Sequence, residues 1–169
     1  KIIFLSLILR FSAFSVSPYP VGSDPWVHLK YIDYFIEYSS IHVPSGFSQY
    51  YVNYPMSHLL VINTSLITSI STHNAMFILA IVLAVSSIIV FLITKMLSGN
   101  SHLALLCILI FNFIDAQIQW STQIIAMTMG IALYAFILYF VFIRLNKSKG
   151  EFKNSLLLLL FLFVITWTH

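Results

Sequence analysis

The sequence predicts an all-α protein: a polytopic transmembrane helical bundle with a long first outer loop that carries juxtamembrane helices. Of its 169 residues, 60% are hydrophobic and only 8% are charged, whereas a soluble domain has about 25% charged residues. The apolar residues are also gathered into long runs. A chain this poor in charge cannot cover a water-facing surface. The composition therefore excludes a cytosolic globular enzyme, a disordered tail and a nucleic-acid-binding module.

Five apolar stretches approach the roughly 20 residues that a transmembrane helix needs. The predicted spans are residues 2–16, 75–97, 103–120, 124–143 and 156–169. Arg10 interrupts the first run and no small-residue cleavage site follows it, which favours a helix over a signal peptide. Because the chain opens on Lys1 and stops within its last run, we expect it to be the N-terminal part of a single transmembrane domain.

The distribution of basic residues indicates which ends of these spans face the cytoplasm. A cluster of them precedes the last run and comprises Arg144, Lys147, Lys149 and Lys153. Short basic loops stay cytoplasmic, so counting back from this cluster makes residues 17–74 a loop that begins and ends outside. That loop holds three of the five acidic residues. We therefore expect a multi-pass integral protein of the cell membrane whose active face is extracytoplasmic.

The outer loop contains two predicted interfacial helices, over residues 25–38 and 56–72. Asp24 is expected to be the N-cap of the first, with Pro25 at its first helical position. At 100° per residue, one stripe of this helix holds Lys30, Asp33 and Glu37, and the opposite side holds Asp24, His28, Ile32 and Phe35. The segment 56–72 is too polar for a lipid-facing span. We expect it to lie in the interface or to re-enter the membrane, strongly tilted relative to the 75–97 helix.

Asp24 and His28 are the first candidates for chemistry. They are four residues apart, so both side chains can reach one point at the membrane surface. A carboxylate there can act as a general base, or hold a divalent metal beside a phosphate. Alternatively, Asp24 only caps its helix and His28 is a satisfied interfacial histidine. The capping and catalytic roles of Asp24 are compatible, because an N-cap carboxylate keeps a second oxygen free.

Four further residues are candidates for binding substrate or phosphate. Asp115 ends an outward span on the same face as Asp24, and acids at membrane depth usually line a site; alternatively, it is a helix-end residue that reaches water. His58 lies in the first turn of the second interfacial helix, where it could contact an anionic ligand. Gln123 could bind hydroxyls or phosphate, and His169 falls toward the outer face.

Several motifs resemble the GT-C superfamily of membrane glycosyltransferases. The run Gly22-Ser23-Asp24-Pro25-Trp26-Val27-His28-Leu29-Lys30-Tyr31 resembles the Asp-Pro-aromatic motif of oligosaccharyltransferase catalytic subunits. The run Tyr54-Pro55-Met56-Ser57-His58-Leu59 resembles the segment that opens a juxtamembrane helix in dolichyl-phosphate-sugar-dependent and archaeal-type relatives. Trp120-Ser121-Thr122-Gln123 and the closing Thr168-His169 are also similar to those relatives.

The resemblance implies an inverting transfer of a sugar or glycan from a polyprenyl-phosphate-linked donor to an acceptor. Asp24 would be the essential aspartate of the first outer loop, which deprotonates or orients the acceptor nucleophile, alone or through a metal. A divalent metal, Mg²⁺ or Mn²⁺, would be held by Asp24 and Asp115. The oligosaccharyltransferases carry an Asp-x-Glu pair in the second outer loop, and here that place reads Asp115-Ala116-Gln117. The partners implied are the lipid bilayer, the polyprenyl-phosphate-sugar donor and an acceptor whose chemical class the sequence does not identify. No nucleic-acid partner is expected.

Two other functions are compatible with the sequence. One is a non-catalytic subunit of a membrane complex, in which Asp24 is only a cap. The other is a transporter, although transporters place their ionisable residues near the bilayer midplane. Here most acids lie outside the bilayer or at helix ends, and only Arg10 is deep.

Overall fold

A computed structural model describes residues 2–16, 22–40, 55–114, 126–146, 160 and 162–164. Within these residues the chain forms helices and turns and no strand, which confirms the all-α prediction. The helices are α1 (Ile2–Val16), α2 (Asp24–Tyr38), α4 (Met56–Thr68), α5 (Thr72–Ala75), α6 (Phe77–Ser98), α7 (Ser101–Phe113) and α9 (Ala126–Asn146).

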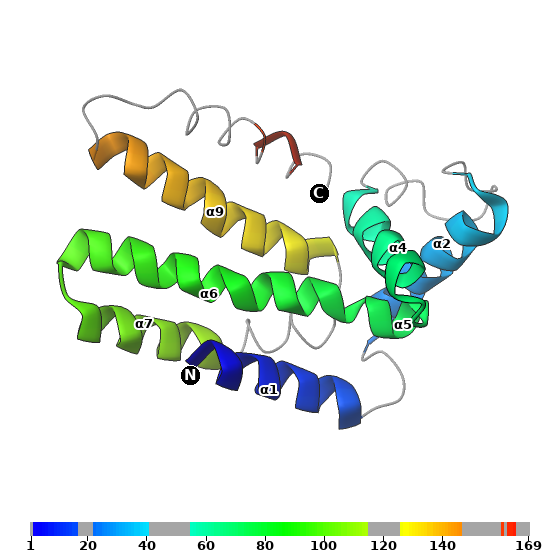
Figure 1. The fold of residues 1–169 in the computed structure, drawn as a ribbon, viewed down its shortest axis with the longest axis horizontal. Coiled ribbons are helices and arrows are strands. Elements are labelled where there is room, and N and C mark those ends of the chain that lie inside the picture. Colours follow the sequence, from blue (N-terminus) through cyan, green and yellow to red (C-terminus); the bar gives the residue numbers. More distant parts are fainter. Residues whose placement is uncertain are drawn as a thin grey trace.

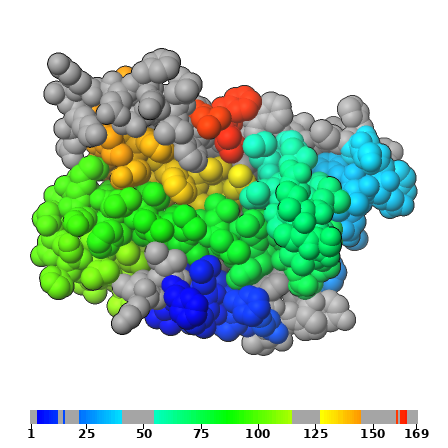
Figure 2. Space-filling view, in the orientation of Figure 1, coloured from blue at the N-terminus to red at the C-terminus, as the bar shows by residue number. Residues whose placement is uncertain are grey.

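Helix α6 is the centre of the arrangement. It contacts α1, α7 and α9, and Figure 1 shows α9 along one side of it and α1 and α7 along the other. Helices α2, α4 and α5 gather at the end where α6 begins (Figure 1). In the space-filling view the α6 and α7 segment forms a continuous band between α9 and α1 (Figure 2).

Two helical segments are long and apolar enough to cross a bilayer. They are Thr72–Ser98, which comprises α5 and α6, and Met127–Arg144 within α9. They match the predicted spans 75–97 and 124–143. By contrast, α1 has 15 residues and α7 has 13, fewer than the roughly 20 that a transmembrane helix needs. The structure therefore supports two spanning helices among the described residues, rather than the full set that the sequence predicts.

Helix α7 is shorter than the predicted span 103–120. It ends at Phe113 because Ile114 adopts an extended backbone, with φ −66° and ψ 131°. The rest of that span lies outside the described residues. Of the last predicted span, 156–169, only residues 160 and 162–164 are described, and all four are helical.

The turn between α6 and α7 is built from local signals in Ser-Gly-Asn-Ser. Gly99 takes the left-handed conformation, with φ 66°, and its N–H donates to the Lys95 carbonyl at 2.9 Å. The Asn100 Oδ1 atom then accepts hydrogen bonds from the backbone N–H groups of His102 (2.8 Å) and Leu103 (3.2 Å). The chain can reverse here in few residues because these bonds satisfy some of the otherwise unpaired backbone groups at both helix ends.

We expect Asn100→Ala to lower the free energy of unfolding by about 1 kcal/mol, because it removes the side-chain cap of α7. Asn100→Asp should stay close to the wild type, since aspartate caps equally well. Thermal unfolding of the detergent-solubilised protein checks both variants. Equal losses for the two substitutions would contradict the capping role.

Helix α2 is amphipathic, as predicted for residues 25–38. Its Lys30, Asp33 and Glu37 are exposed, whereas His28, Ile32 and Phe35 are buried. Asp24 departs from the prediction: the wheel placed it on the buried side, but it is exposed. Helical side chains tilt toward the N-terminus, so a side chain in the first turn extends past the covered face. The N-cap residue is also Ser23 rather than Asp24.

The second predicted interfacial helix, 56–72, is divided in two. Helix α4 ends at Thr68 because Ser69 is left-handed, with φ 57°. Ser71 then caps the short helix α5, and the Thr72 hydroxyl donates to the Asp33 carboxylate at 2.9 Å. This bond ties α2 to α5. Figure 1 shows α4 steeply inclined to α6, as predicted.

One apolar core joins the α2, α4 and α5 group to the long helices. It consists of Leu29, Ile32, Val61, Ala75, Met76, Leu79, Ala80, Met129 and Leu133. These residues come from α2, α4, α5, α6 and α9 and the short connection after α5. Burial of their apolar surface holds α2 in a defined position at the end of the bundle. The side chains of α2 are therefore placed by the core and not by local structure alone.

Candidate functional site

A hydrogen-bonded pair of histidines joins α2 to α4. His28 lies in the second turn of α2 and His58 in the first turn of α4. Their ring atoms His28 Nδ1 and His58 Nε2 are 2.7 Å apart, and both residues are buried, with 3% and 2% of their surface exposed. Each histidine is a candidate from the sequence alone. The structure brings them together across thirty residues of chain.

Two aromatic side chains lie against His58 of this pair. The ring of fully buried Tyr31 lies 5.8 Å from that of His58, centroid to centroid, and the Phe35 ring lies 6.1 Å from it. Burial, and to a lesser extent the nearby His28, lowers the pKa of His58 to about 3. Burial also lowers the pKa of His28 to about 4, against the opposing effect of the Asp24 charge. Both rings are therefore neutral at pH 7.

The neutral pair leaves one ring nitrogen unsatisfied. If His58 donates its Nε2 proton to His28, its Nδ1 is an acceptor; if His28 donates, the His58 Nδ1 carries the proton. In either tautomer, His58 Nδ1 has no hydrogen-bond partner among the described residues, and neither has the buried Ser57 hydroxyl. Unpaired buried polar atoms are costly and rare in native proteins. The first turn of α4 therefore has two polar atoms available to another group.

Asp24 stands next to the histidine pair at the start of α2. Its side chain is exposed, and it is close enough for its charge to act on the pKa of His28. Because both imidazoles are neutral, no imidazolium neutralises this carboxylate. An accessible carboxylate with no cationic histidine beside it can accept a proton from a substrate hydroxyl or amide.

The described residues do not complete a metal site around Asp24. They include no group of three or more His, Cys, Asp or Glu side chains placed to bind one ion. Asp33 and Glu37 lie roughly 13 Å and 20 Å further along the same helix, at 1.5 Å per residue. Mg²⁺ requires several oxygen ligands around one point. A metal held by Asp24 and Asp115 stays a prediction, because Asp115 lies outside the described residues.

Three predicted site residues, Asp115, Gln123 and His169, lie outside the described residues. Their roles stay predictions. Sequence reasoning did not identify a second polar cluster, in which Arg10 and Ser6 of α1 meet Ser87 of α6 and Asn112 of α7. A signal was present, because Arg10 follows Ser6 by one helical turn and Asn112 interrupts an apolar helix.

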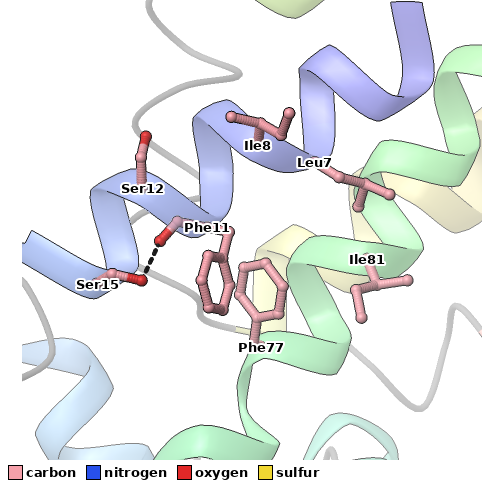
Figure 3. Close-up of a pocket in the computed structure, with 7 residues that line it drawn as sticks. All are labelled: Leu7, Ile8, Phe11, Ser12, Ser15, Phe77 and Ile81. Carbon is pink, nitrogen blue, oxygen red and sulfur yellow. Dashed lines mark hydrogen bonds between the residues drawn. The ribbon is translucent and has the colours of Figure 1, made fainter. Parts of the chain in front are cut away.

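An apolar groove of about 450 Å³ lies between α1 and α6. Figure 3 shows Phe11 and Phe77 side by side in it, and their rings meet edge to face at 5.4 Å. Its two serines donate to their own helix: Ser12 to the Leu9 carbonyl and Ser15 to the Phe11 carbonyl. The groove therefore offers no polar group for chemistry, and the candidate site stays with Asp24, His28 and His58.

Comparison of the chain with protein-family models, with curated proteins and with solved structures finds no match. A function for this protein therefore rests on its own residues and geometry.

Proposed function

We propose that this protein is a membrane glycosyltransferase. It transfers a sugar from a polyprenyl-phosphate-linked donor to an acceptor on the extracytoplasmic face, with inversion at the anomeric carbon. The observation that carries this proposal is the exposed carboxylate of Asp24 beside a buried, neutral histidine pair. The run that resembles the Asp-Pro-aromatic motif of GT-C enzymes, Asp24-Pro25-Trp26, falls at this same place.

The proposed reaction assigns Asp24 the role of general base. Its carboxylate accepts the proton of the acceptor nucleophile, which attacks the anomeric carbon of the donor. The bond from that carbon to the phosphate oxygen breaks, and polyprenyl phosphate leaves with the electron pair. The histidine pair holds the start of α2 against α4 without placing a positive charge next to Asp24. This neutrality supports the role of Asp24 as a base.

Two kinds of observation support the membrane setting. Thr72–Ser98 and Met127–Arg144 are long and apolar enough to cross a bilayer. Large apolar side chains of α1 and α7 are also exposed, among them Phe4 (68%), Leu106 (50%) and Ile110 (52%). Exposed apolar side chains in such number favour lipid or protein contact over water.

The proposed topology predicts which segments are accessible from each side. We expect a cysteine at Ser45 to react only with reagent outside the cell, and one at Ser148 only after the membrane is opened. The native Cys107 is first replaced by serine, so that each variant carries one thiol. Labelling of both positions from the same side would contradict the topology and the placement of Asp24 outside.

The proposed activity is tested with the full-length protein in liposomes. A panel of polyprenyl-phosphate and polyprenyl-pyrophosphate sugars is offered, and release of the free polyprenyl phosphate or pyrophosphate is followed. We expect release to depend on the protein and on at least one donor. Folded protein that consumes none of these donors would contradict the proposal.

Arg10 favours a second candidate function, that of a transporter. It is a charged residue buried among three helices, α1, α6 and α7, and buried charges of this kind often line an ion or substrate pathway. Anion flux into proteoliposomes tests this alternative. Flux without consumption of any polyprenyl-linked sugar would favour the transporter over the glycosyltransferase.

A further inference from the structure

Arg10 is held inside the bundle by neutral groups. Only 3% of its surface is exposed. Its Nη1 atom donates to the Ser6 carbonyl and to the Asn112 Oδ1 atom, both at 3.1 Å, and also contacts the Ser6 hydroxyl. These contacts fix the plane of the guanidinium group between α1 and α7.

The other edge of this guanidinium is buried without a polar partner among the described residues. Its Nε and Nη2 atoms are buried and have no hydrogen-bond partner within the part of the chain that the structure describes. These two atoms share one edge of the planar group, and their N–H bonds point the same way. This is an edge with which arginine binds two oxygens of a single carboxylate or phosphate.

The cluster around Arg10 has more donors than acceptors. One oxygen, Asn112 Oδ1, accepts from the Ser6 hydroxyl at 2.6 Å, from the Ser87 hydroxyl at 3.1 Å and from Arg10 Nη1. A carbonyl oxygen has two lone pairs, so three donors exceed its capacity. The Asn112 amide cannot be turned to help, because its Nδ2 atom already donates to the Ile108 carbonyl at 2.9 Å. A group that brings several acceptor oxygens would relieve this excess.

The positive charge is also without a described counter-charge. Arginine stays protonated in proteins, and a buried charge needs a partner. The three acids among the described residues are Asp24, Asp33 and Glu37, which all lie on α2 and are exposed. Charge, edge geometry and donor excess therefore all favour an oxyanion at the same place.

We propose that the Nε and Nη2 edge of Arg10 binds a phosphate group between α1, α6 and α7. Two phosphate oxygens accept hydrogen bonds from this edge. A third can accept the hydrogen bond that the Ser6 or Ser87 hydroxyl now donates to Asn112 Oδ1. The oxyanion site follows from the geometry of the cluster. The choice of phosphate rests on the proposed function, in which polyprenyl phosphate is the leaving group.

Direct binding tests this site without any sugar transfer. The full-length protein in phosphatidylcholine nanodiscs is titrated with a polyprenyl monophosphate, with the matching polyprenol and with inorganic phosphate. We expect the monophosphate to bind at least about 10-fold more tightly than the alcohol, and Arg10→Lys to abolish this preference, because lysine lacks the two-donor edge. Arg144→Lys is the matched control, since Arg144 is exposed, and should leave binding unchanged.

A second variant keeps the test decisive if Arg10→Lys does not fold. Asn112→Asp places a carboxylate beside Arg10, so that the protein itself supplies a negative charge for the guanidinium group. We expect it to raise the melting temperature and to weaken phosphate binding by at least about 10-fold. Wild-type binding by folded Asn112→Asp, or equal binding of monophosphate and alcohol by the wild type, would overturn the proposal.

The three ligands of this titration also distinguish free phosphate from the phosphate of a lipid headgroup. Competition by inorganic phosphate at the affinity of the lipid would assign the site to free phosphate, whereas preference for the lipid would assign it to a lipid headgroup. Both results uphold the site only if Arg10→Lys removes the binding. Because no transfer is measured, phosphate binding without sugar transfer would contradict the proposed function alone, and transfer without Arg10-dependent binding would contradict this inference alone.

Discussion

Asp24→Asn is expected to reduce sugar transfer by a factor on the order of 10² to 10⁴ while the protein stays folded. Asparagine has nearly the shape of aspartate but cannot accept the proton of the acceptor. In the first turn of α2 it loses only the interaction of the aspartate charge with the helix dipole, about 0.3–1 kcal/mol. The substitution should therefore remove the base without disturbing α2. Initial rates of transfer are measured together with expression level and melting temperature.

Asp33→Asn is the matched control for this variant. Asp33 is exposed on the same helix, and an amide oxygen at that position can still accept the Thr72 hydroxyl that bonds to it. We expect this variant to keep transfer within about twofold of the wild type, since a surface substitution away from the site changes little. Wild-type transfer by Asp24→Asn would contradict the catalytic role of Asp24. An equal loss in both variants would show a structural effect on α2 instead.

Acid is expected to destabilise the protein through the histidine pair. The pKa of His28 is lowered to about 4 and that of His58 to about 3, whereas an exposed histidine has a pKa of 6.5. Above pH 6.5 both the folded and the unfolded chain hold these rings neutral, so the full stability is present. As the pH falls below 6.5, the two histidines bind protons in the unfolded chain but stay neutral in the folded chain. The free energy of unfolding therefore decreases down to about pH 3.

Each histidine contributes about 1.4 kcal/mol of lost stability per pH unit in this window. Together they should lower the free energy of unfolding by an amount on the order of 5 kcal/mol between pH 6.5 and pH 4. Melting temperatures measured across that range check this. Replacing His58 with leucine should flatten the dependence, and replacing the exposed His102 with glutamine should not. A pH profile that is the same in both variants and the wild type would contradict the buried pair.

The sequence predicted those features that depend on local pattern. The 3.6-residue period identified the buried face of α2, with His28, Ile32 and Phe35, and long apolar runs identified α6 and α9. Periodicity placed Asp24 on the buried side of α2, whereas it is exposed. A helical wheel does not take into account that a side chain in the first turn extends beyond the helices that cover that face. Local pattern also missed the break at Ser69, where a single left-handed residue ends α4 within a run that reads as helical.

The pairing of distant residues could not be read from the sequence. His28 and His58 meet only because the shared core packs α2 against α4. Arg10 and Asn112 are 102 positions apart and meet because α1 and α7 both pack near α6. Neither contact has a spacing that a motif could encode. His28 and His58 were therefore predicted only as separate candidates. The histidine pair and the arginine cluster become visible only once the packing of the helices is known.

The most direct measurement of the proposed function is the fate of a labelled donor in sealed proteoliposomes. A polyprenyl-phosphate sugar is presented on the face at which a cysteine at position 45 is labelled, and the anomeric configuration of the product is determined. The account predicts protein-dependent transfer with inverted configuration, lost in Asp24→Asn and kept in Asp33→Asn. Folded, correctly oriented protein that transfers no sugar from any polyprenyl-linked donor, or that transfers it equally well without the Asp24 carboxylate, would contradict it.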